Sequence, residues 1–300
     1  FSPAIRLFTE AKYVRTRAFT ISQPSFDFFT YLASDNAYLR QRFGAAAVPD
    51  GAFISRDNLD FGIRGQESDR ETIRGVIGFD GRINDRLRYE VSYNYGRATA
   101  DTLNTNDRVA DRYFAALDAV VNPATGQITC RINLPGQTIV DPNNYDQAPT
   151  TFQPGQCVPL NILGNGSPTP QALAFILANH TDQARITQQV ANGYLSGDFG
   201  GLFELPGGPI SYVLGAEYRK ETSRSVPSAL TQQGALADNA QIFPESGSFD
   251  VKEAFAELNI PILRAVPFAE TLSIGAAIRF SDYSTVGGTT TWNLNGIWAP

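Results

Sequence analysis

Several stretches of this chain alternate apolar and polar residues for ten or more positions, and this pattern limits the folds open to it. The clearest apolar series is Leu87, Tyr89, Val91, Tyr93 and Tyr95, with a polar residue between each pair. Successive side chains of a β-strand point to opposite faces. A period of two therefore predicts a strand with one apolar and one polar face.

These strands are longer than is usual in globular proteins, where five or six residues are typical. A strand of about 13 residues rises roughly 43 Å, or about 33 Å vertically when it is tilted by about 40°. That height suffices to cross the apolar layer of an outer membrane. The alternation predicts an all-β chain: an antiparallel transmembrane β-barrel segment, open and partial, with long extracellular loops that contain short helices.

Seven strands are expected, mostly in pairs joined by short turns. They are Arg70–Ile83, Arg86–Arg97, Arg185–Phe199, Ile210–Thr222, Phe249–Ile260, Thr271–Tyr283 and Thr289–Ala299. The turns are expected at Asn84-Asp85, Glu204–Pro209, Pro261–Pro267 and Ser284–Gly288. Long polar connections occupy residues 98–184, 223–248 and most of 1–51. Helical spacing predicts helices at Asp107–Val121 and at Thr169–Ala178, the second begun by Ser167 and Pro168.

Short turns on one side and long connections on the other are typical of outer-membrane barrels. With the long connections outside, one aromatic band forms the outer rim: Tyr93, Tyr95, Tyr218, Phe280 and Tyr283. A second band forms the inner rim: Phe79, Tyr212 and Trp298. We expect both bands on the lipid-facing side.

Charge and hydropathy exclude two other classes of protein. A net charge of −6 argues against a nucleic-acid partner, which needs a basic surface. No stretch approaches 18 consecutive apolar residues, which excludes a transmembrane helix, whereas a mean hydropathy of −0.19 fits a barrel. The chain begins at Phe1 and contains no Met, so we expect it to be a fragment, with a processed mature chain as the alternative.

The two cysteines, Cys130 and Cys157, lie in the same long connection. Neither has a cysteine or histidine at metal-binding spacing, because the only histidine is His180. We expect a disulfide, which indicates an oxidising compartment, with a reactive thiol as the alternative. Closing this loop would stabilise the fold by roughly 3–4 kcal/mol in the chain-entropy model.

The polar residues form no recognisable catalytic motif. Four glutamates fall on the polar side of the expected strands: Glu217, Glu221, Glu253 and Glu257. We interpret them as solvated residues balanced by three arginines, Arg219, Arg279 and Arg74. His180 has no Ser or Cys motif beside it, so a triad is unsupported. We expect no enzyme activity, no cofactor and no metal site.

Substrate contacts, if this part of the protein makes them, should come from the long connections. Four aromatic residues there are candidate platforms for a ligand: Tyr113, Phe114, Tyr145 and Phe152. Four polar residues are candidate partners: Asp141, Asn143, Asn144 and Gln147. The alternative is that the aromatic side chains pack a small core within the connection itself.

Several segments together resemble the middle of TonB-dependent outer-membrane receptors, most of all the large receptors of sphingomonad- and caulobacter-type bacteria. These segments are DFGIRGQESDRETIRGVIGFDG (Asp60–Gly81), LRYEVSYNYG (Leu87–Gly96), LFELPGGPISYVLGAEYRKE (Leu202–Glu221), SFDVKEAFAELNIPIL (Ser248–Leu263) and TLSIGAAIRFSDYSTVGG (Thr271–Gly288). The resemblance covers most of residues 51–300, whereas residues 1–50 are less diagnostic.

The resemblance implies a role in active uptake of a scarce solute, such as siderophore-bound iron, cobalamin or an oligosaccharide, across the bacterial outer membrane. It implies outer-membrane lipid, a plug domain and, through the plug, the TonB complex as partners. Neither the family's plug with its TonB-contacting box nor its closing aromatic strand is present in this sequence. We expect residues 1–52 to be an extracellular loop region and residues 53–300 a partial barrel with a large loop at 98–184.

Two other functions share part of this pattern. A passive porin would have the same strands without a plug, usually with shorter external loops. A soluble secreted carbohydrate-binding β-protein would bury the apolar faces of its strands instead of presenting them to lipid. Detergent dependence of the intact protein discriminates them, because ready solubility without detergent would contradict both barrel interpretations.

Overall fold

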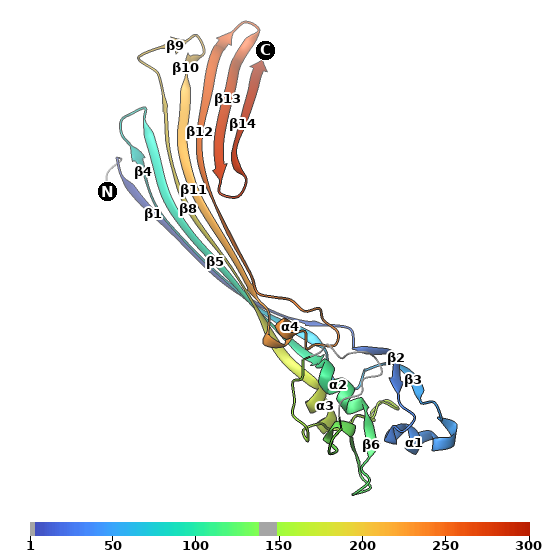
Figure 1. Cartoon of the computed structure of the whole chain (residues 1–300). Helices are drawn as coiled ribbons and strands as arrows, with labels where there is room; N and C mark the ends of the chain where they lie inside the picture. Colours follow the sequence, from blue (N-terminus) through green and yellow to red (C-terminus); the bar gives the residue numbers. More distant parts are fainter. Residues whose placement is uncertain (1–3, 138–148) are drawn as a thin grey trace.

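The computed structural model describes residues 4–137 and 149–300, and its dominant element is one antiparallel sheet of eight long strands (Figure 1). In spatial order the strands are β1 (Arg6–Ile21), β4 (Gly65–Arg82), β5 (Arg88–Arg108), β8 (Leu177–Asp198), β11 (Ser211–Val226), β12 (Glu245–Val266), β13 (Ala269–Tyr283) and β14 (Gly287–Ala299). The expected all-β class with antiparallel strands is confirmed at this level.

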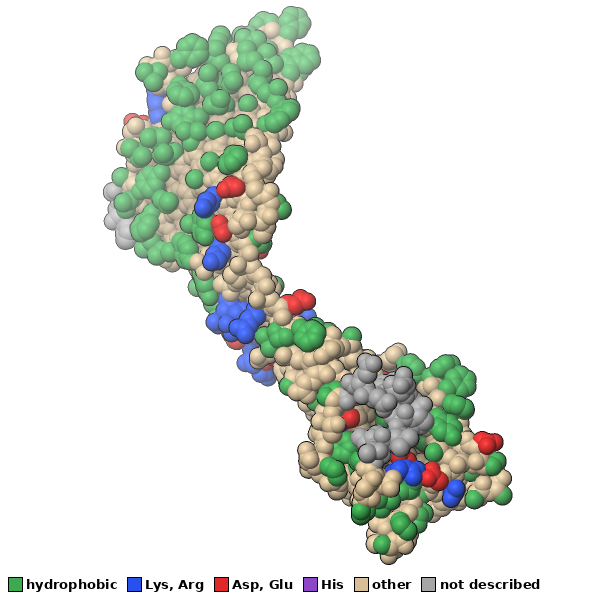
Figure 2. Space-filling view, in the orientation of Figure 1, with side chains coloured by type: hydrophobic (Ala, Val, Ile, Leu, Met, Phe, Trp, Pro, Cys, Tyr) green, Lys and Arg blue, Asp and Glu red, His purple; other side chains and the backbone are tan. Residues whose placement is uncertain are grey.

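Strand register brings the apolar residues of neighbouring strands to one side of the sheet. Phe79 of β4 lies opposite Val91 of β5, and Ile77 lies opposite Tyr93. Farther along the sheet, Ile278 of β13 lies opposite Trp292 of β14. Because side chains alternate along every strand, these pairings create a continuous apolar face and an opposite polar face. Figure 2 shows hydrophobic side chains gathered over the far end of the sheet.

The sheet is open in the described part of the chain. β1 pairs only with β4, and β14 pairs only with β13. Each of these edge strands is 13 residues or longer. Long edges of this kind present unpaired N–H and C=O groups to whatever lies beside them.

The expected loop region at residues 1–52 is wrong for Arg6–Ile21, because these residues form β1 and pair with β4 over their whole length. Apolar alternation in β1 is interrupted by Arg15 and Arg17, which hid the strand. Both arginines form ion pairs with Asp69 of β4, at 2.5 and 2.9 Å. The partner that makes these residues compatible with a strand lies more than fifty positions away in the sequence.

The large loop is shorter than residues 98–184, since β5 continues to Arg108 and β8 already begins at Leu177. In both strands the hydrogen-bonded ladder continues beyond the apolar stretch, with polar residues on both faces. The turn expected at Pro261–Pro267 is also shorter. β12 passes through a bulge between Pro261 and Leu263, where a proline is tolerated, and turns at residues 267–268.

The other three turns between the long strands lie where they were expected, including the turn at residues 284–286 between β13 and β14. Between β4 and β5, the side chain of Asn84 accepts hydrogen bonds from the backbone N–H groups of Arg86 and Leu87. Between β8 and β11, the short strands β9 (Glu204–Leu205) and β10 (Gly208–Pro209) form a small hairpin. Tyr283 was misplaced, because it lies opposite Val251 on the polar face.

The connections at the other end of the sheet form a separate packed unit, called the head region here: residues 22–64, 109–137, 149–176 and 227–244 (Figure 1). Its elements are β2 (Phe26–Leu32), α1 (Ala37–Phe43), η1 (Ala45–Ala47), β3 (Ala52–Asp57), α2 (Ala110–Leu117), β6 (Ala119–Val121), β7 (Ile128–Cys130), η2 (Arg131–Asn133), α3 (Pro170–Ile176) and α4 (Ala229–Gln233). Both expected helices exist but are short. α2 is bounded by β5 and β6, and α3 is preceded by its N-cap Thr169, whose side chain accepts from the N–H of Ala172.

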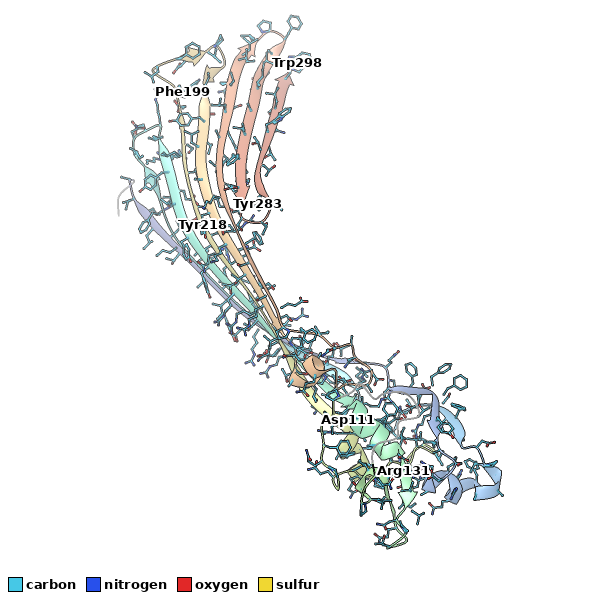
Figure 3. All side chains as sticks on the ribbon, viewed as in Figure 1. Asp111, Arg131, Phe199, Tyr218, Tyr283 and Trp298 are labelled. Carbon is cyan, nitrogen blue, oxygen red and sulfur yellow. A yellow bond between two sulfur atoms is a disulfide. The ribbon has the colours of Figure 1, made fainter. Side chains whose placement is uncertain are left out.

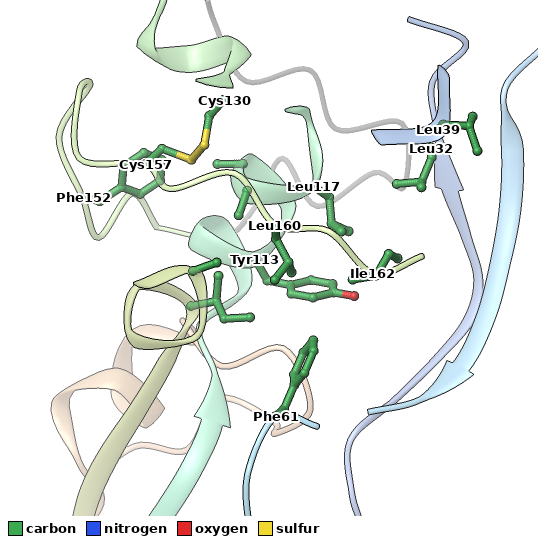
Figure 4. Packing of buried hydrophobic residues seen from close by; sticks show 14 of the residues in the cluster. Leu32, Leu39, Phe61, Tyr113, Leu117, Cys130, Phe152, Cys157, Leu160 and Ile162 are labelled. Carbon is green, nitrogen blue, oxygen red and sulfur yellow. A yellow bond between two sulfur atoms is a disulfide. The ribbon is translucent and has the colours of Figure 1, made fainter. Parts of the chain in front are cut away.

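The hydrophobic core of the molecule lies in this head region (Figure 4). α2 and α3 contribute Tyr113, Leu117 and Ile176, and they pack against Leu160 and Leu39 from other segments. Cys130 and Cys157 lie in the same core and are joined by a disulfide, with their Cα atoms 6.0 Å apart. The head is therefore packed like a small globular protein, whereas the sheet exposes its apolar face.

Candidate functional site

Two glutamates of the polar face, Glu253 and Glu217, are held by neighbouring side chains. Glu253 is buried, accepts a hydrogen bond from the Ser281 hydroxyl at 2.5 Å and lies 3.8 Å from Arg279. Glu217 lies directly opposite Glu253 and accepts from Asn192 at 3.2 Å. These contacts stabilise two carboxylates that face each other across adjacent strands.

The remaining charged residues of this face differ partly from expectation. Glu221 accepts a hydrogen bond from Gln188 at 3.0 Å and lies 3.8 Å from Arg219. Glu257 is exposed. Arg74 does not balance these glutamates, because it pairs at 2.5 Å with Glu10 of β1, the strand that was not expected.

A more compact group of polar residues lies where the polar face meets the head region. We call it the junction cluster, and its members are Arg64, Asn104, Asp107, His180 and Asp182. Asp107 accepts from Arg64 Nε at 2.6 Å and lies 2.9 Å from His180 Nε2. Asp182 accepts from Asn104 at 2.9 Å and from the backbone N–H of Ser228 at 2.8 Å.

A bulge in β5 builds the junction cluster. The pairing with β8 shifts register between Asn104 and Asp107, and Asn106 takes a positive φ of 57°. A bulge inserts an extra residue and changes the direction in which the following side chains point. Asp107 is thereby turned to the same side as Asn104 and His180, although strict alternation would place it on the opposite face.

The charge of Asp107 is maintained by its partners. Burial by itself raises the pKa of this carboxyl, but hydrogen bonds from His180 and Arg64 outweigh burial and lower the pKa below its ordinary value. Asn239 of the head region also donates to Asp107, at 3.2 Å. Asp107 thus connects β5, β8 and two head segments through one carboxylate.

The junction cluster lines a pocket of about 220 Å³. Further lining comes from Ser22, Gln66, Thr231 and Asn239. The side chain of His180 is only 5 % exposed, and its Nδ1 has no hydrogen-bond partner among the described residues. The nearest carboxylate oxygen is that of Asp182, 3.8 Å away. This arrangement suits the binding of a small polar group by hydrogen bonds and charge.

A second buried charged group fixes the head region to the end of β5. Arg108 donates to Asp27 at 2.8 Å and to Asp238 at 2.6 Å, and its guanidinium lies 4.6 Å from the centre of the Tyr113 ring. The Tyr113 hydroxyl donates to Asp27 at 2.7 Å. Burial, reinforced by the Asp27 carboxylate, raises the pKa of Tyr113 well above its ordinary value.

The aromatic residues that were candidates for ligand contact do not form an exposed platform. Tyr113 is 1 % exposed and Phe152 is 5 % exposed, both within the core, and Phe152 packs edge-on against Phe175. Phe114 is half-buried and packs against Tyr113. For these three the alternative interpretation, packing within the connection, fits. The other candidates, Asp141, Asn143, Asn144, Tyr145 and Gln147, lie outside the described residues.

Sequence reasoning missed an exposed aromatic group on the head. Phe28, Phe29 and Phe53 project from β2 and β3, and the ring centres of Phe28 and Phe29 lie 4.5 Å apart. A bulge in β2 and a positive φ of 53° at Phe29 bring these rings outward. The consecutive Phe28-Phe29 pair in an expected loop was the available signal.

Within the described ranges, no group of three or more His, Cys, Asp or Glu side chains could hold a metal ion. The helices that the structure describes are all too short or too polar to span a membrane. A scan of the sequence against models of known protein families finds no match. A search of curated proteins finds no relative either.

Proposed function

We propose that this chain is part of the barrel wall of a TonB-dependent outer-membrane receptor that binds a scarce solute and transports it by gated, energy-coupled passage. The solute is siderophore-bound iron, cobalamin or an oligosaccharide. The observation that carries the proposal is the exposed apolar face. Trp292 is 77 % exposed, Trp298 66 % and Leu294 66 %, a degree of exposure that water would penalise.

The dimensions of this face suit a bilayer. β13 has 15 residues and β14 has 13, and the 13 residues of β14 span about 33 Å vertically at a tilt of about 40°. Tyr218 and Phe280 lie toward one end of the apolar face and Trp298 toward the other (Figure 3 labels Tyr218 and Trp298). Aromatic side chains at both limits are typical of membrane-crossing barrels.

The two ends of the sheet differ, and this difference supports one orientation across the membrane, with the head region outside. Tight turns close one end, whereas the disulfide-linked head region lies at the other. A disulfide suits the cell exterior or periplasm. The sheet's two unpaired edges require further strands for closure, and the polar face would then line a lumen that receives the family's plug domain.

The junction cluster gives this lumen a polar surface immediately below the head. A polar solute that passes from the outside would meet the pocket formed by Asp107, His180 and Asp182. Its groups are donors, acceptors and charges, which suit reversible binding. The proposed chemistry is therefore binding and passage, without a covalent step.

Brominated lipids test the position of the apolar face, because Trp292 and Trp298 are the only tryptophans of the chain. Their separation of six positions along the strand corresponds to about 15 Å of depth when the strand is tilted. In the complete protein in lipid vesicles, with tryptophans outside this chain replaced by phenylalanine, Trp298→Phe leaves Trp292, which bromines near the acyl-chain ends should quench best. Trp292→Phe leaves Trp298, which bromines near the headgroups should quench best. Absence of quenching in both variants would contradict the membrane position.

Energy coupling needs its own experiment in cells that express the complete receptor. Uptake of the solute should stop when the TonB complex is deleted or the proton-motive force is collapsed, while binding at the cell surface persists. Uptake that continues under both conditions would instead indicate a passive channel. Quenching of the two tryptophans would then still place the strands in lipid.

A further inference from the structure

His180 carries a buried nitrogen atom that the fold leaves without a partner. Its Nε2 lies 2.9 Å from a carboxylate oxygen of Asp107, whereas its Nδ1 has no hydrogen-bond partner among the described residues. The side chain is only 5 % exposed, and it lines the pocket of the junction cluster. A buried polar atom without a partner is costly, so an occupant of the pocket that pairs with Nδ1 would stabilise this arrangement.

Asp107 determines which ring nitrogen of His180 carries the proton. The lowered pKa of the Asp107 carboxyl means that it is ionised at neutral pH, and an ionised carboxylate only accepts hydrogen bonds. Nε2 of His180 must therefore be the donor to Asp107. In a neutral imidazole the other nitrogen, Nδ1, then has a free lone pair. The pocket thus contains a buried acceptor that requires a hydrogen-bond donor.

A carboxylate oxygen lies beside this acceptor. Oδ1 of Asp182 is 3.8 Å from Nδ1 of His180, so a single donor atom can lie about 2.9 Å from both. Asp182 already accepts from Asn104 and from the backbone N–H of Ser228, but each of its oxygens has a second lone pair. An occupant with two N–H or O–H groups on one atom can therefore donate to both residues at once.

The charges that line the pocket favour a cation. They are the carboxylates of Asp107 and Asp182 and the guanidinium of Arg64, two negative charges against one positive, and the other lining side chains are uncharged when His180 is neutral. Arg64 pairs with Asp107 at 2.6 Å. In the described part of the chain, Asp182 forms no ion pair with an arginine or lysine. Its charge is therefore available to a positively charged occupant.

Two further charged residues lie near the pocket on the same face of the sheet. Arg70 of β4 and Glu245 of β12 both lie in the row of Ala184, one two-residue step beyond Asp182. Arg70 is two strands to one side of Ala184, and Glu245 is two strands to the other. Because their charges are opposite and their distances from β8 are similar, they leave the excess negative charge of the pocket in place.

We propose that the junction cluster binds the primary ammonium group of a small cationic solute, which donates to His180 Nδ1 and to the carboxylate of Asp182. An ammonium group supplies both the N–H donors and the positive charge that the pocket lacks. The pocket measures about 220 Å³, and Ala240 and Ile242 line it as well, which gives the carbon chain of the solute apolar contact. This inference rests on the proposed function, because the solute would reach the pocket along the lumen.

The test compares probes that share a butyl chain and differ in their polar group: n-butylammonium, n-butyltrimethylammonium, 1-butanol and butyrate. Binding to the complete protein in neutral detergent is measured by ligand-observed NMR at pH 8, where an ordinary imidazole is neutral. n-Butylammonium should bind about tenfold more tightly, or better, than 1-butanol, which has no charge, and than the trimethyl probe, which has no N–H group. Butyrate should not bind. Equal binding of n-butylammonium and either of the first two comparison probes overturns the proposal.

Asp182→Asn tests the carboxylate, and Asp101→Asn is its matched control. Asp182→Asn should weaken the binding of n-butylammonium about 10- to 100-fold, the range for a hydrogen bond between charged groups. Asp101 is exposed on the opposite face of β5, so its neutralisation removes the same charge and should change the affinity less than about twofold at 0.15 M salt. Equal losses in the two variants would overturn the assignment to this pocket. If Asp182→Asn does not fold, the probe comparison on the wild-type protein still decides.

Nitrogen NMR of histidine tests the role of Nδ1. His180 is the only histidine of this chain, and its resonances in the complete protein are identified by their loss in His180→Gln. n-Butylammonium should shift the resonance of the unprotonated ring nitrogen, and 1-butanol at the same concentration should not. Binding of n-butylammonium without this shift would overturn the contact with His180.

The remaining outcomes separate this inference from the proposed function. If n-butylammonium does not bind while uptake depends on the TonB complex, the ammonium site is overturned and the proposed function stands. If n-butylammonium binds while uptake continues without the TonB complex, the ammonium site stands and energy coupling is overturned. A lysine of the complete protein that already filled the pocket would also prevent probe binding, and it would overturn the assignment to a solute.

Discussion

The Tyr113 hydroxyl donates a hydrogen bond of 2.7 Å to Asp27 at a site that solvent does not reach. Tyr113→Phe should destabilise the head region by about 1.5–3 kcal/mol, because it removes a hydrogen bond to a buried charged group. Arg108 still compensates the Asp27 charge, so the head should remain folded. Hydrogen exchange of the amides of α2 in urea measures the difference.

Tyr38→Phe is the matched control for this substitution. It deletes the same atom from a half-buried tyrosine whose hydroxyl lies 3.5 Å from the carbonyl of Pro159, at the limit of hydrogen bonding. Its effect should stay below about 0.5 kcal/mol, as is usual for substitutions without a strong contact. Equal losses in the two variants would show that the buried charge does not depend on Tyr113.

Asp107 should make the junction cluster sensitive to acid. Its pKa is lower in the folded protein than in an unfolded chain, so its contribution is complete above the unfolded value, about 3.9, and disappears as pH falls through the folded value. Asp107→Asn should therefore destabilise the head at pH 7, and its difference in stability from the wild type should be smaller at pH 3, which lies below the unfolded pKa. Amide exchange of α4 at both pH values measures this. A stability difference between the variant and the wild type that is the same at both pH values would contradict the lowered pKa of Asp107.

Strand β11 depends on a glycine for its packing on the polar face. A Cβ at Gly215 would come within 2.2 Å of the Phe255 ring, which also carries Arg279 at 5.0 Å. Gly215→Ala should displace that ring and cost about 1–3 kcal/mol, as overpacking does elsewhere. Gly96→Ala on β5 is the control, because nothing lies within 4 Å of its Cβ. Urea unfolding followed by tryptophan fluorescence compares the two.

The same strands show what could be read from the sequence. Alternation located seven of the eight long strands and their apolar sides, because period-two burial is a local property of the chain. β1 was missed because Arg15 is compatible with a strand only through Asp69, and no local pattern reports such a partner. The strand ends were placed too early because ladder hydrogen bonds continue beyond Arg97, where apolar residues stop.

The candidate site was less accessible to sequence reasoning than the fold. His180 stood out as a single histidine, but its contact with Asp107 depends on a bulge that turns the carboxylate across the sheet. Tyr113 was taken as a possible ligand platform, and its helical spacing supported burial equally well. Tyr113 is buried because it contacts Asp27 and Arg108, which come from other segments, and its local sequence does not show these contacts.

In the whole molecule, the core and the apolar face are separate, so the two parts should unfold separately. The head is held by its own core and by the Cys130–Cys157 disulfide, whereas the sheet is held by its ladders and, in our proposal, by lipid. Reduction of the disulfide should destabilise the head by about 3–4 kcal/mol in the chain-entropy model. It should leave the sheet unchanged. Trp292 and Trp298 both lie on β14 and report on the sheet, once tryptophans outside this chain are replaced by phenylalanine.

Urea unfolding of the complete protein in detergent, with and without reductant, tests this separation. Amide exchange in α2 and α3 should shift to lower urea after reduction, while the fluorescence transition of Trp292 and Trp298 stays in place. A Cys130→Ser, Cys157→Ser variant should reproduce the shift without reductant. If both signals moved together in one transition, the head and the sheet would form a single cooperative unit, and the bulge at Asp107 would be the contact to examine as their link.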